Sequence, residues 1–182
     1  MIHKVFLVLC FTFMAYCGSA QGLQNFDFYY GHSQVSQEAK EYYAHLFDVN
    51  SSNKAYSILD SVFTQNDETR PFYIFLICRM LKEARGEMLI ELNIICRHAA
   101  EMYPNSLIPV LYAGKNYVDE DVKDLWASRM ATEIRVTCNG ELMNCFKDSR
   151  STALQHCDTY NKGRLESLYN FIRKDLNLFQ QR

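Results

Sequence analysis

The positions of apolar residues predict a chain that is helical almost throughout after residue 33. Apolar side chains recur every three or four positions in segments such as 36–47, 53–63 and 121–137, as they do on one face of an α-helix. Only 7 glycines and 3 prolines interrupt the whole chain. The pattern therefore predicts an all-α fold, a compact single-domain bundle of about six or seven helices over residues 34–182.

The most apolar stretch outside the first twenty residues covers residues 72–104 and predicts a central helical hairpin. Residues 72–78 are all apolar, and good helix formers follow them. Gly86 favours the end of the first helix. If the chain reverses there, Cys78 and Cys96 stand at similar heights on facing helices, so we expect a disulfide between them. A helix that ran straight through would separate them by about 27 Å, too far for a bond.

The remaining segments predict shorter or terminal helices. Residues 105–118 contain Pro109 and Gly114 and predict a short helix or a turn. Residues 141–157 predict one or two short helices. Residues 165–179 predict a terminal helix with its apolar side chains facing the core, among them Leu165, Leu168, Tyr169, Ile172, Leu176 and Phe179.

The first twenty residues have the three parts of an export signal. Lys4 supplies a positive charge, residues 5–16 form an apolar run, and residues 18–20 are small. The run is too short to span a hydrocarbon core of about 30 Å, which takes about 20 helical residues. A lipid-anchored form is disfavoured because a bulky residue precedes each cysteine of this segment. We therefore expect a cleaved signal peptide over residues 1–20 and a protein that is exported, periplasmic or extracellular, without a membrane attachment.

Residues 21–33 predict an irregular arm rich in aromatic side chains. Its four rings belong to Phe26, Phe28, Tyr29 and Tyr30. Packing of these rings on the core is the simpler expectation, because large exposed apolar patches are uncommon on soluble monomers. The alternative is an exposed patch for a protein partner, because aromatic residues are enriched at interfaces.

A group of acidic residues begins the helix predicted at 119–138. Asp119, Glu120, Asp121 and Asp124 lie where carboxylates favour the start of a helix. They lack the glycine-centred ligand loop of a calcium-binding hand. The first three of them, together with the four rings of the arm, are the candidate residues for contact with a partner.

Five of the seven cysteines follow the expected signal peptide, and all five are candidates for disulfides: Cys78, Cys96, Cys138, Cys145 and Cys157. An exported protein meets an oxidising compartment, where nearby thiols form disulfides. The odd number leaves at least one thiol free or available to another chain. The spacing allows Cys145 to bond with either Cys138 or Cys157.

The sequence contains no recognisable catalytic or metal-binding pattern, so we expect no cofactor and no enzymatic activity. Gly-x-Ser-x-Gly, His-Glu-x-x-His and glycine-rich phosphate loops do not occur. His98 and Glu101 are one helical turn apart, but a di-metal site needs a second such pair. Cys138, Cys145, His156 and Cys157 are zinc-binding residue types without a Cys-x-x-Cys spacing.

The charge of the chain narrows the class of partner that we expect. The chain has 19 basic and 21 acidic residues and no basic cluster, which disfavours a nucleic-acid partner. We therefore predict an exported protein-binding module. Its most concrete form is an immunity-type inhibitor that neutralises a toxin or hydrolase in the bacterial periplasm. The alternatives are a helical carrier of a small apolar ligand and a eukaryotic secreted helical factor.

Overall fold

The computed structural model describes residues 25–51, 53–63, 66–138 and 140–177, and the regular structure in these ranges is entirely helical. The all-α bundle is confirmed, with nine helices in the described ranges instead of six or seven. They are α2 (Phe26–Gly31), α3 (Gln37–Tyr43), α4 (Lys54–Ser61), α5 (Arg70–Glu83), α6 (Gly86–Met102), α7 (Pro104–Leu111), α8 (Val122–Thr137), α9 (Leu142–His156) and α10 (Lys162–Asp175).

Several expectations fall on residues that are not described. The expected signal peptide over residues 1–20 lies outside the described residues, as do residues 21–24 of the aromatic arm and the predicted inward side chain of Phe179. Among the helices of the described ranges, none combines the length and the apolar character needed to cross a membrane.

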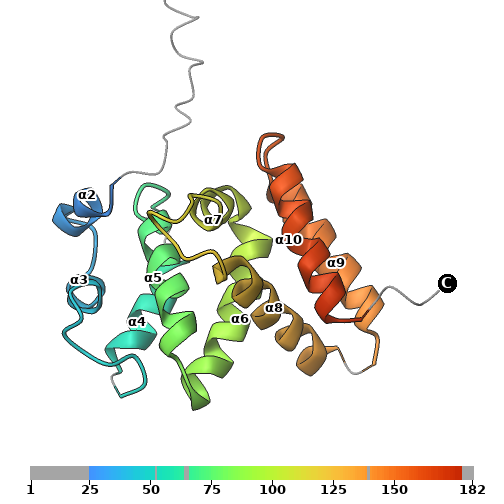
Figure 1. Cartoon of the computed structure of the whole chain (residues 1–182), viewed down its shortest axis with the longest axis horizontal. Helices are drawn as coiled ribbons and strands as arrows, with labels where there is room; N and C mark the ends of the chain where they lie inside the picture. The colour runs from blue at the N-terminus through green and yellow to red at the C-terminus, as the bar shows by residue number, and fades with distance from the viewer. Residues whose placement is uncertain (1–24, 52, 64–65, 139, 178–182) are drawn as a thin grey trace, which may run out of the picture.

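The helices form one bundle around a continuous hydrophobic core. In Figure 1, helices α2, α3 and α4 lie on one side and α9 and α10 on the other, with α5 to α8 between them. Helix α6 packs mainly against α8 and α9, α10 packs against α8, and α5 packs against α7. Every helix contributes buried apolar side chains to the core.

Helix α5 is the most deeply buried element. Ten of its 14 residues are buried, including the whole apolar run from Phe72 to Cys78. A helix that is apolar on all sides is stable only inside a protein, because it has no face to offer water. Pro71 lies in the first turn, where it costs no backbone hydrogen bond. The predicted central helix of the hairpin is therefore confirmed.

The hairpin is present, but the predicted disulfide across it is wrong. The chain leaves α5 through the extended residues Ala84 and Arg85 and enters α6 at Gly86, which has a φ of 56°. Cys78 and Cys96 are both buried free thiols. Helices α5 and α6 touch at few places, because each packs on other helices.

Helix α8 also packs on the turn of α6 that contains Cys96. The indole Nε1 of Trp126, on α8, donates to the carbonyl of Cys96 at 3.1 Å. Trp126 is completely buried. Helix α6 is therefore joined to α8 by this hydrogen bond at the Cys96 turn, and the Cys96 thiol stays free in the core.

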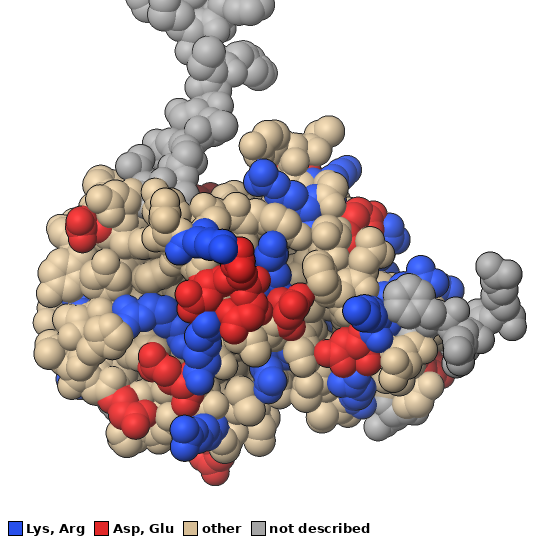
Figure 2. All heavy atoms as spheres, in the orientation of Figure 1, with Lys and Arg blue, Asp and Glu red and all other residues tan. Residues whose placement is uncertain are grey.

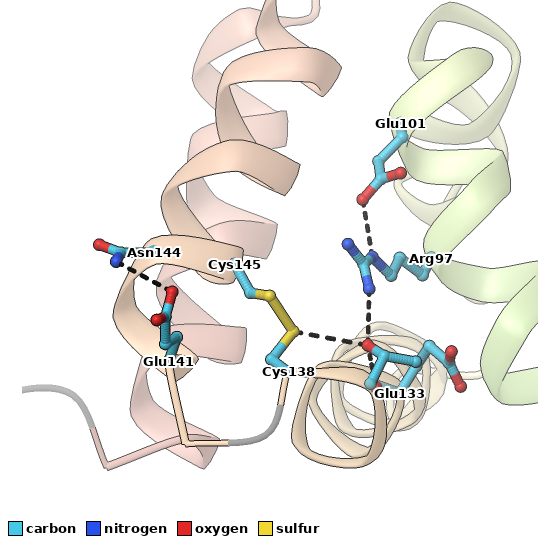
Figure 3. Close-up of a disulfide and its surroundings, with 8 residues drawn as sticks. Arg97, Glu101, Glu133, Cys138, Glu141, Asn144 and Cys145 are labelled. Carbon is cyan, nitrogen blue, oxygen red and sulfur yellow. Dashed lines mark hydrogen bonds and ion pairs between the residues drawn. A yellow bond between two sulfur atoms is a disulfide. The ribbon is translucent and has the colours of Figure 1, made fainter.

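The disulfide that braces the fold joins Cys138 to Cys145, with their Cα atoms 6.2 Å apart. Figure 3 shows this bond between the end of α8 and the first turns of α9. It resolves the choice left open for Cys145, and Cys157 is a buried free thiol at the end of α9. Gly140, with a φ of 94°, belongs to the tight turn that the bond closes.

Two further segments differ from their predictions. The arm expected to be irregular contains helix α2, whose start is capped by the side chain of Asn25 as it accepts from the amide of Asp27 at 3.2 Å. Residues 142–156 form one helix of 15 residues rather than short ones. Capping by Asn25 supports α2, and contact of α9 with α6 accompanies its greater length.

Candidate binding groove

A groove of about 550 Å³ opens on the surface between α5 and two loops. Its floor is one face of α5, one wall is the corner after α3 at Tyr43 and His45, and the other wall is the segment 115–122 between α7 and α8. Figure 2 shows acidic side chains flanked by basic ones over the middle of the visible face, where the segment between α7 and α8 runs in Figure 1. The groove is therefore both concave and charged.

The floor follows from the spacing of residues along α5. Phe75, Cys78, Arg79, Lys82 and Glu83 all line the groove. These positions are three or four apart and so share one helical face. The first two close the floor against the core, and the charged heads of the others extend into the groove while their aliphatic stems cover apolar surface.

Ion pairs join the floor to the loop wall. The ammonium of Lys82 lies 2.5 Å from a carboxylate oxygen of Asp119 and 3.0 Å from one of Asp121. These two hydrogen bonds raise the pKa of Lys82. Lys115 pairs with Glu120 at 2.8 Å. Three of the four acidic residues predicted to favour the start of a helix therefore pair with lysines. Asp121, although it precedes α8, makes no capping hydrogen bond through its side chain.

The corner after α3 holds the guanidinium of Arg79. Its Nη1 donates to the carbonyl of Tyr43 at 3.1 Å, and its Nη2 lies 2.6 Å from Nε2 of His45. The guanidinium carbon also lies 5.5 Å and 5.7 Å from the ring centres of Tyr42 and Tyr43. Since a guanidinium only donates, a ring nitrogen of His45 accepts in this contact. His45 has a φ of 58°, a left-handed conformation that is uncommon outside glycine.

Glu83 forms its hydrogen bond with Tyr42 and not with Arg79. Its carboxylate accepts a hydrogen bond from the Tyr42 hydroxyl at 2.8 Å. Burial and then this carboxylate raise the pKa of Tyr42 well above its usual value, so the phenol stays protonated and keeps donating. The pair fixes the end of the groove floor against α3.

The thiol at the bottom of the groove is not a nucleophile at neutral pH. Cys78 is only 2% exposed, and burial raises the pKa of its thiol far above the usual range. The reactive form of cysteine is the thiolate. Nor do the residues described here contain a cluster of three or more metal-ligating side chains.

Helix α2 borders the groove and brings the aromatic arm to it. The ring of Phe26 stacks on Phe75 at 3.8 Å between centres and meets Tyr117 edge-on at 5.4 Å. Tyr30 lies 5.7 Å from Tyr43. The two sets of predicted partner-binding residues, far apart in sequence, therefore flank one groove.

The four rings of the arm divide between the two expectations stated for them. Phe26 and Tyr29 are buried in the core, at 7% and 2% exposure, as the packing interpretation requires. Phe28 and Tyr30 are 43% and 44% exposed, as the partner interpretation requires. Burial of alternate rings thus anchors α2 and leaves the other two at the surface.

The sequence did not identify several residues that form the floor and walls of the groove: Tyr43, His45, Arg79, Lys82 and Tyr117. One signal was available, because Arg79 is the only charged residue between Phe72 and Leu81. A cation in an otherwise apolar helix needs polar partners supplied by other elements. The sequence does not show which elements supply them.

The other candidate residues have structural partners. Glu101 pairs with Arg97 at 2.8 Å, and the His98 ring lies 5.1 Å from that of Phe63. Cys138 and Cys145 are used by the disulfide, and Nδ1 of His156 lies 2.7 Å from the carbonyl of Glu101. These residues do not come together as a site.

The fold and the groove thus define an all-α bundle with a charged groove bordered by aromatic rings. Comparison with known proteins adds no relative: no family model, no curated protein and no solved structure matches the chain.

Proposed function

We propose that this protein is an exported protein-binding module that binds its partner through the groove surface, formed by the groove with its borders at α2 and at residues 117–121. The observation that carries the proposal is the convergence of exposed rings on a charged groove. Tyr30 is half-exposed and lies 5.7 Å from Tyr43 in one wall, and Tyr117 is 36% exposed in the other. Phe28 is half-exposed on the same short helix as Tyr30. Exposed apolar patches on soluble proteins mark sites of interaction.

The composition of the groove surface fits a protein interface. Interfaces are enriched in tyrosine, phenylalanine and arginine at their centres and have polar rims. Here Arg79 lies on the floor between walls that contain Tyr43 and Tyr117, and the same surface carries the ion pairs of Lys82 with Asp119 and of Lys115 with Glu120. Its most concrete role is inhibition of a toxin or hydrolase in the exported compartment.

A carrier of a wholly apolar ligand fits this groove less well. Five of its twelve lining residues are charged: Arg79, Lys82, Glu83, Lys115 and Asp119. An apolar ligand placed there would remove water from charged groups without replacing their hydrogen bonds, which is costly. The charges instead favour a partner with polar as well as apolar groups.

A capture experiment with matched variants tests the proposal. The oxidised protein, expressed from its full sequence, serves as bait in the native envelope or secreted fraction. The Phe28→Ser/Tyr30→Ser and Tyr117→Ser variants are compared with Tyr160→Ser, which removes a ring that is 79% exposed between α9 and α10. We expect one stoichiometric partner with the wild type and with Tyr160→Ser, and its loss with the two groove-surface variants.

Further results test both the inhibitory role and the binding surface. Addition of the purified protein should reduce the activity of the captured toxin or hydrolase in proportion to the amount bound. Capture that is equal for all variants would contradict the groove surface as the binding site. Absence of any stoichiometric partner would contradict the protein-binding function itself.

A further inference from the structure

Arg79 differs from the other cations of the groove in having no carboxylate partner. Lys82 pairs with Asp119 and Asp121, and Lys115 pairs with Glu120. Within the described part of the chain, no carboxylate oxygen lies within 4.0 Å of the Arg79 guanidinium. Its positive charge is held in the groove by a carbonyl, an imidazole and two rings, none of which carries a negative charge.

The guanidinium also has hydrogen-bonding capacity left over. It has five N–H groups in a planar fork. Its contacts within the described residues are those of Nη1 with Tyr43 and of Nη2 with His45, and Nε makes none. A carboxylate accepts two parallel N–H bonds from such a fork, the strongest geometry available to this pair of groups.

Aromatic surface lies beside this cation. Phe75 is one turn before Arg79 on the floor of the groove, Tyr43 lies in one wall and Tyr117 in the other. A volume of about 550 Å³ falls in the range of small-ligand sites. The groove therefore has room for a planar or large apolar group next to an anion.

The acidic residues of the groove do not occupy Arg79 in place of a ligand. Glu83 accepts from the Tyr42 hydroxyl, and Asp119 is bound to Lys82. The carboxylates of Asp121 and Glu120, beside the groove, likewise pair with Lys82 and Lys115. A negatively charged group can therefore reach Arg79 without displacing a carboxylate of the described residues from it.

The geometry points to Arg79 as the binding site for a carboxylate that is carried next to an aromatic or large apolar group. This inference rests on the proposed function, because on a protein partner such a carboxylate is either a chain terminus or an acidic side chain adjacent to an apolar one. Arg79 also supports the end of α3 through the carbonyl of Tyr43. The test therefore needs a readout that a purely structural role would leave unchanged.

Paired probes supply that readout. N-acetylphenylalanine carries a terminal carboxylate next to a ring, and N-acetylphenylalaninamide carries the same ring without the charge. Binding is followed by NMR of the full-length protein with ¹⁵N-labelled arginine side chains. We expect the acid to bind with a Kd of about 1 mM and to shift the Nε–H signal of Arg79, and the amide to bind at least about tenfold more weakly.

A third probe separates the two sources of the carboxylate. N-acetylglutamylphenylalaninamide carries its charge on a side chain and has no free terminus. If it binds more tightly than N-acetylphenylalanine, the site favours an acidic side chain. If it binds more weakly, the site favours a chain terminus. Failure of both acids to bind more tightly than the amide would overturn the inference.

Variants assign the effect to one residue. Arg79→Gln removes the charge, and Arg79→Lys keeps the charge but loses the fork. Arg164→Gln is the matched control, because Arg164 also lies over tyrosine rings, those of Tyr112 and Tyr160, but is exposed and outside the groove. We expect affinity for the acid to fall at least about tenfold in Arg79→Gln, less in Arg79→Lys and not at all in Arg164→Gln. Equal affinity of Arg79→Gln and the wild type would overturn the inference.

Folding of the variants does not limit the test. Circular dichroism melting shows whether Arg79→Gln remains folded. If it does not, the wild-type protein still decides, because the shift of the Arg79 Nε–H signal must saturate with the acid and stay absent with the amide. Saturating shifts of Arg164 without shifts of Arg79 would overturn the inference.

The outcomes also separate this inference from the proposed function. Capture of a partner that depends on Phe28, Tyr30 and Tyr117 but is unchanged in Arg79→Gln would keep the protein-binding function and reject the carboxylate site. Selective binding of the acid probe without any partner that depends on the groove surface would keep the carboxylate site and reject the protein-binding function.

Discussion

Removal of the Cys138–Cys145 disulfide is expected to lower the free energy of unfolding by about 2.5 kcal/mol. The two cysteines are 7 positions apart, so the bond closes a short loop, and the chain-entropy relation gives this value for a loop of that length. The relevant variant is Cys138→Ala/Cys145→Ala. Its effect reaches α6 as well, because Arg97 donates to the Thr137 hydroxyl at 3.0 Å, and that hydroxyl lies 3.5 Å from the sulfur of Cys138.

Urea unfolding with and without reductant measures this contribution. Reduction should lower the free energy of unfolding of the wild type by about 2.5 kcal/mol, and it should not change that of the double variant. Cys96→Ala is the control. This substitution removes a completely buried thiol and lowers the free energy of unfolding by about 1 kcal/mol before any reduction. Reduction should then lower the free energy of unfolding of this variant by the same further amount as in the wild type.

Peptide mapping provides an independent check on the connectivity. Alkylation of the native protein should leave Cys78 and Cys96 unmodified, and alkylation after unfolding without reductant should modify both of them. A linked pair of peptides carrying these two residues would refute the finding that Cys78 and Cys96 are free thiols. Sensitivity of the Cys138→Ala/Cys145→Ala variant to reductant would refute it in the same way.

Two further predictions concern pH and backbone conformation. Burial raises the pKa of Tyr42 and Tyr169 above 10.0 in the folded protein, so its stability is intact below pH 10 and falls as pH rises further. The slope is up to about 1.4 kcal/mol per pH unit for each tyrosine, and melting from pH 8 to 12 should show it reduced in Tyr42→Phe/Tyr169→Phe. An unchanged slope would contradict burial as its cause. Gly114→Ala should lower Tm by about 3–6 °C because φ is 90° there, whereas Gly163→Ala, inside α10, should not lower it. Equal melting of the two variants would contradict strain at residue 114.

The helices were predictable because their signals are local. Ser36 caps α3 by accepting from the amide of Ala39 at 3.2 Å, as its position before an acidic first turn indicates. Pro71 lies in the first turn of α5, as predicted. Gly86 was predicted to end the first helix of the hairpin, but α5 already ends at Glu83 and Gly86 is the first residue of α6, so the signal located the reversal of the chain and not the helix end. Signals of this kind act over a few residues, so the helix boundaries that they favour do not depend on the tertiary arrangement.

The disulfide and the groove were less predictable because they depend on contacts between distant segments. Spacing alone left two possible partners for Cys145 and predicted a disulfide for Cys78, which is a free thiol. The two borders of the groove were each named as candidate residues, but their meeting depends on the contacts of Phe26 with Phe75 and Tyr117. No periodic pattern in the sequence encodes those contacts.

The burial of α5 links the stability of the core to the shape of the groove. The helix that fills the centre of the bundle also forms the groove floor, and Arg79 is held on it by residues of a different element, Tyr43 and His45. Side chains fixed in this way lose little further freedom on binding, which lowers the entropic cost of association. A ligand or partner therefore meets a cation that the fold has already oriented, and changes that loosen α5 should weaken binding even when they lie outside the groove.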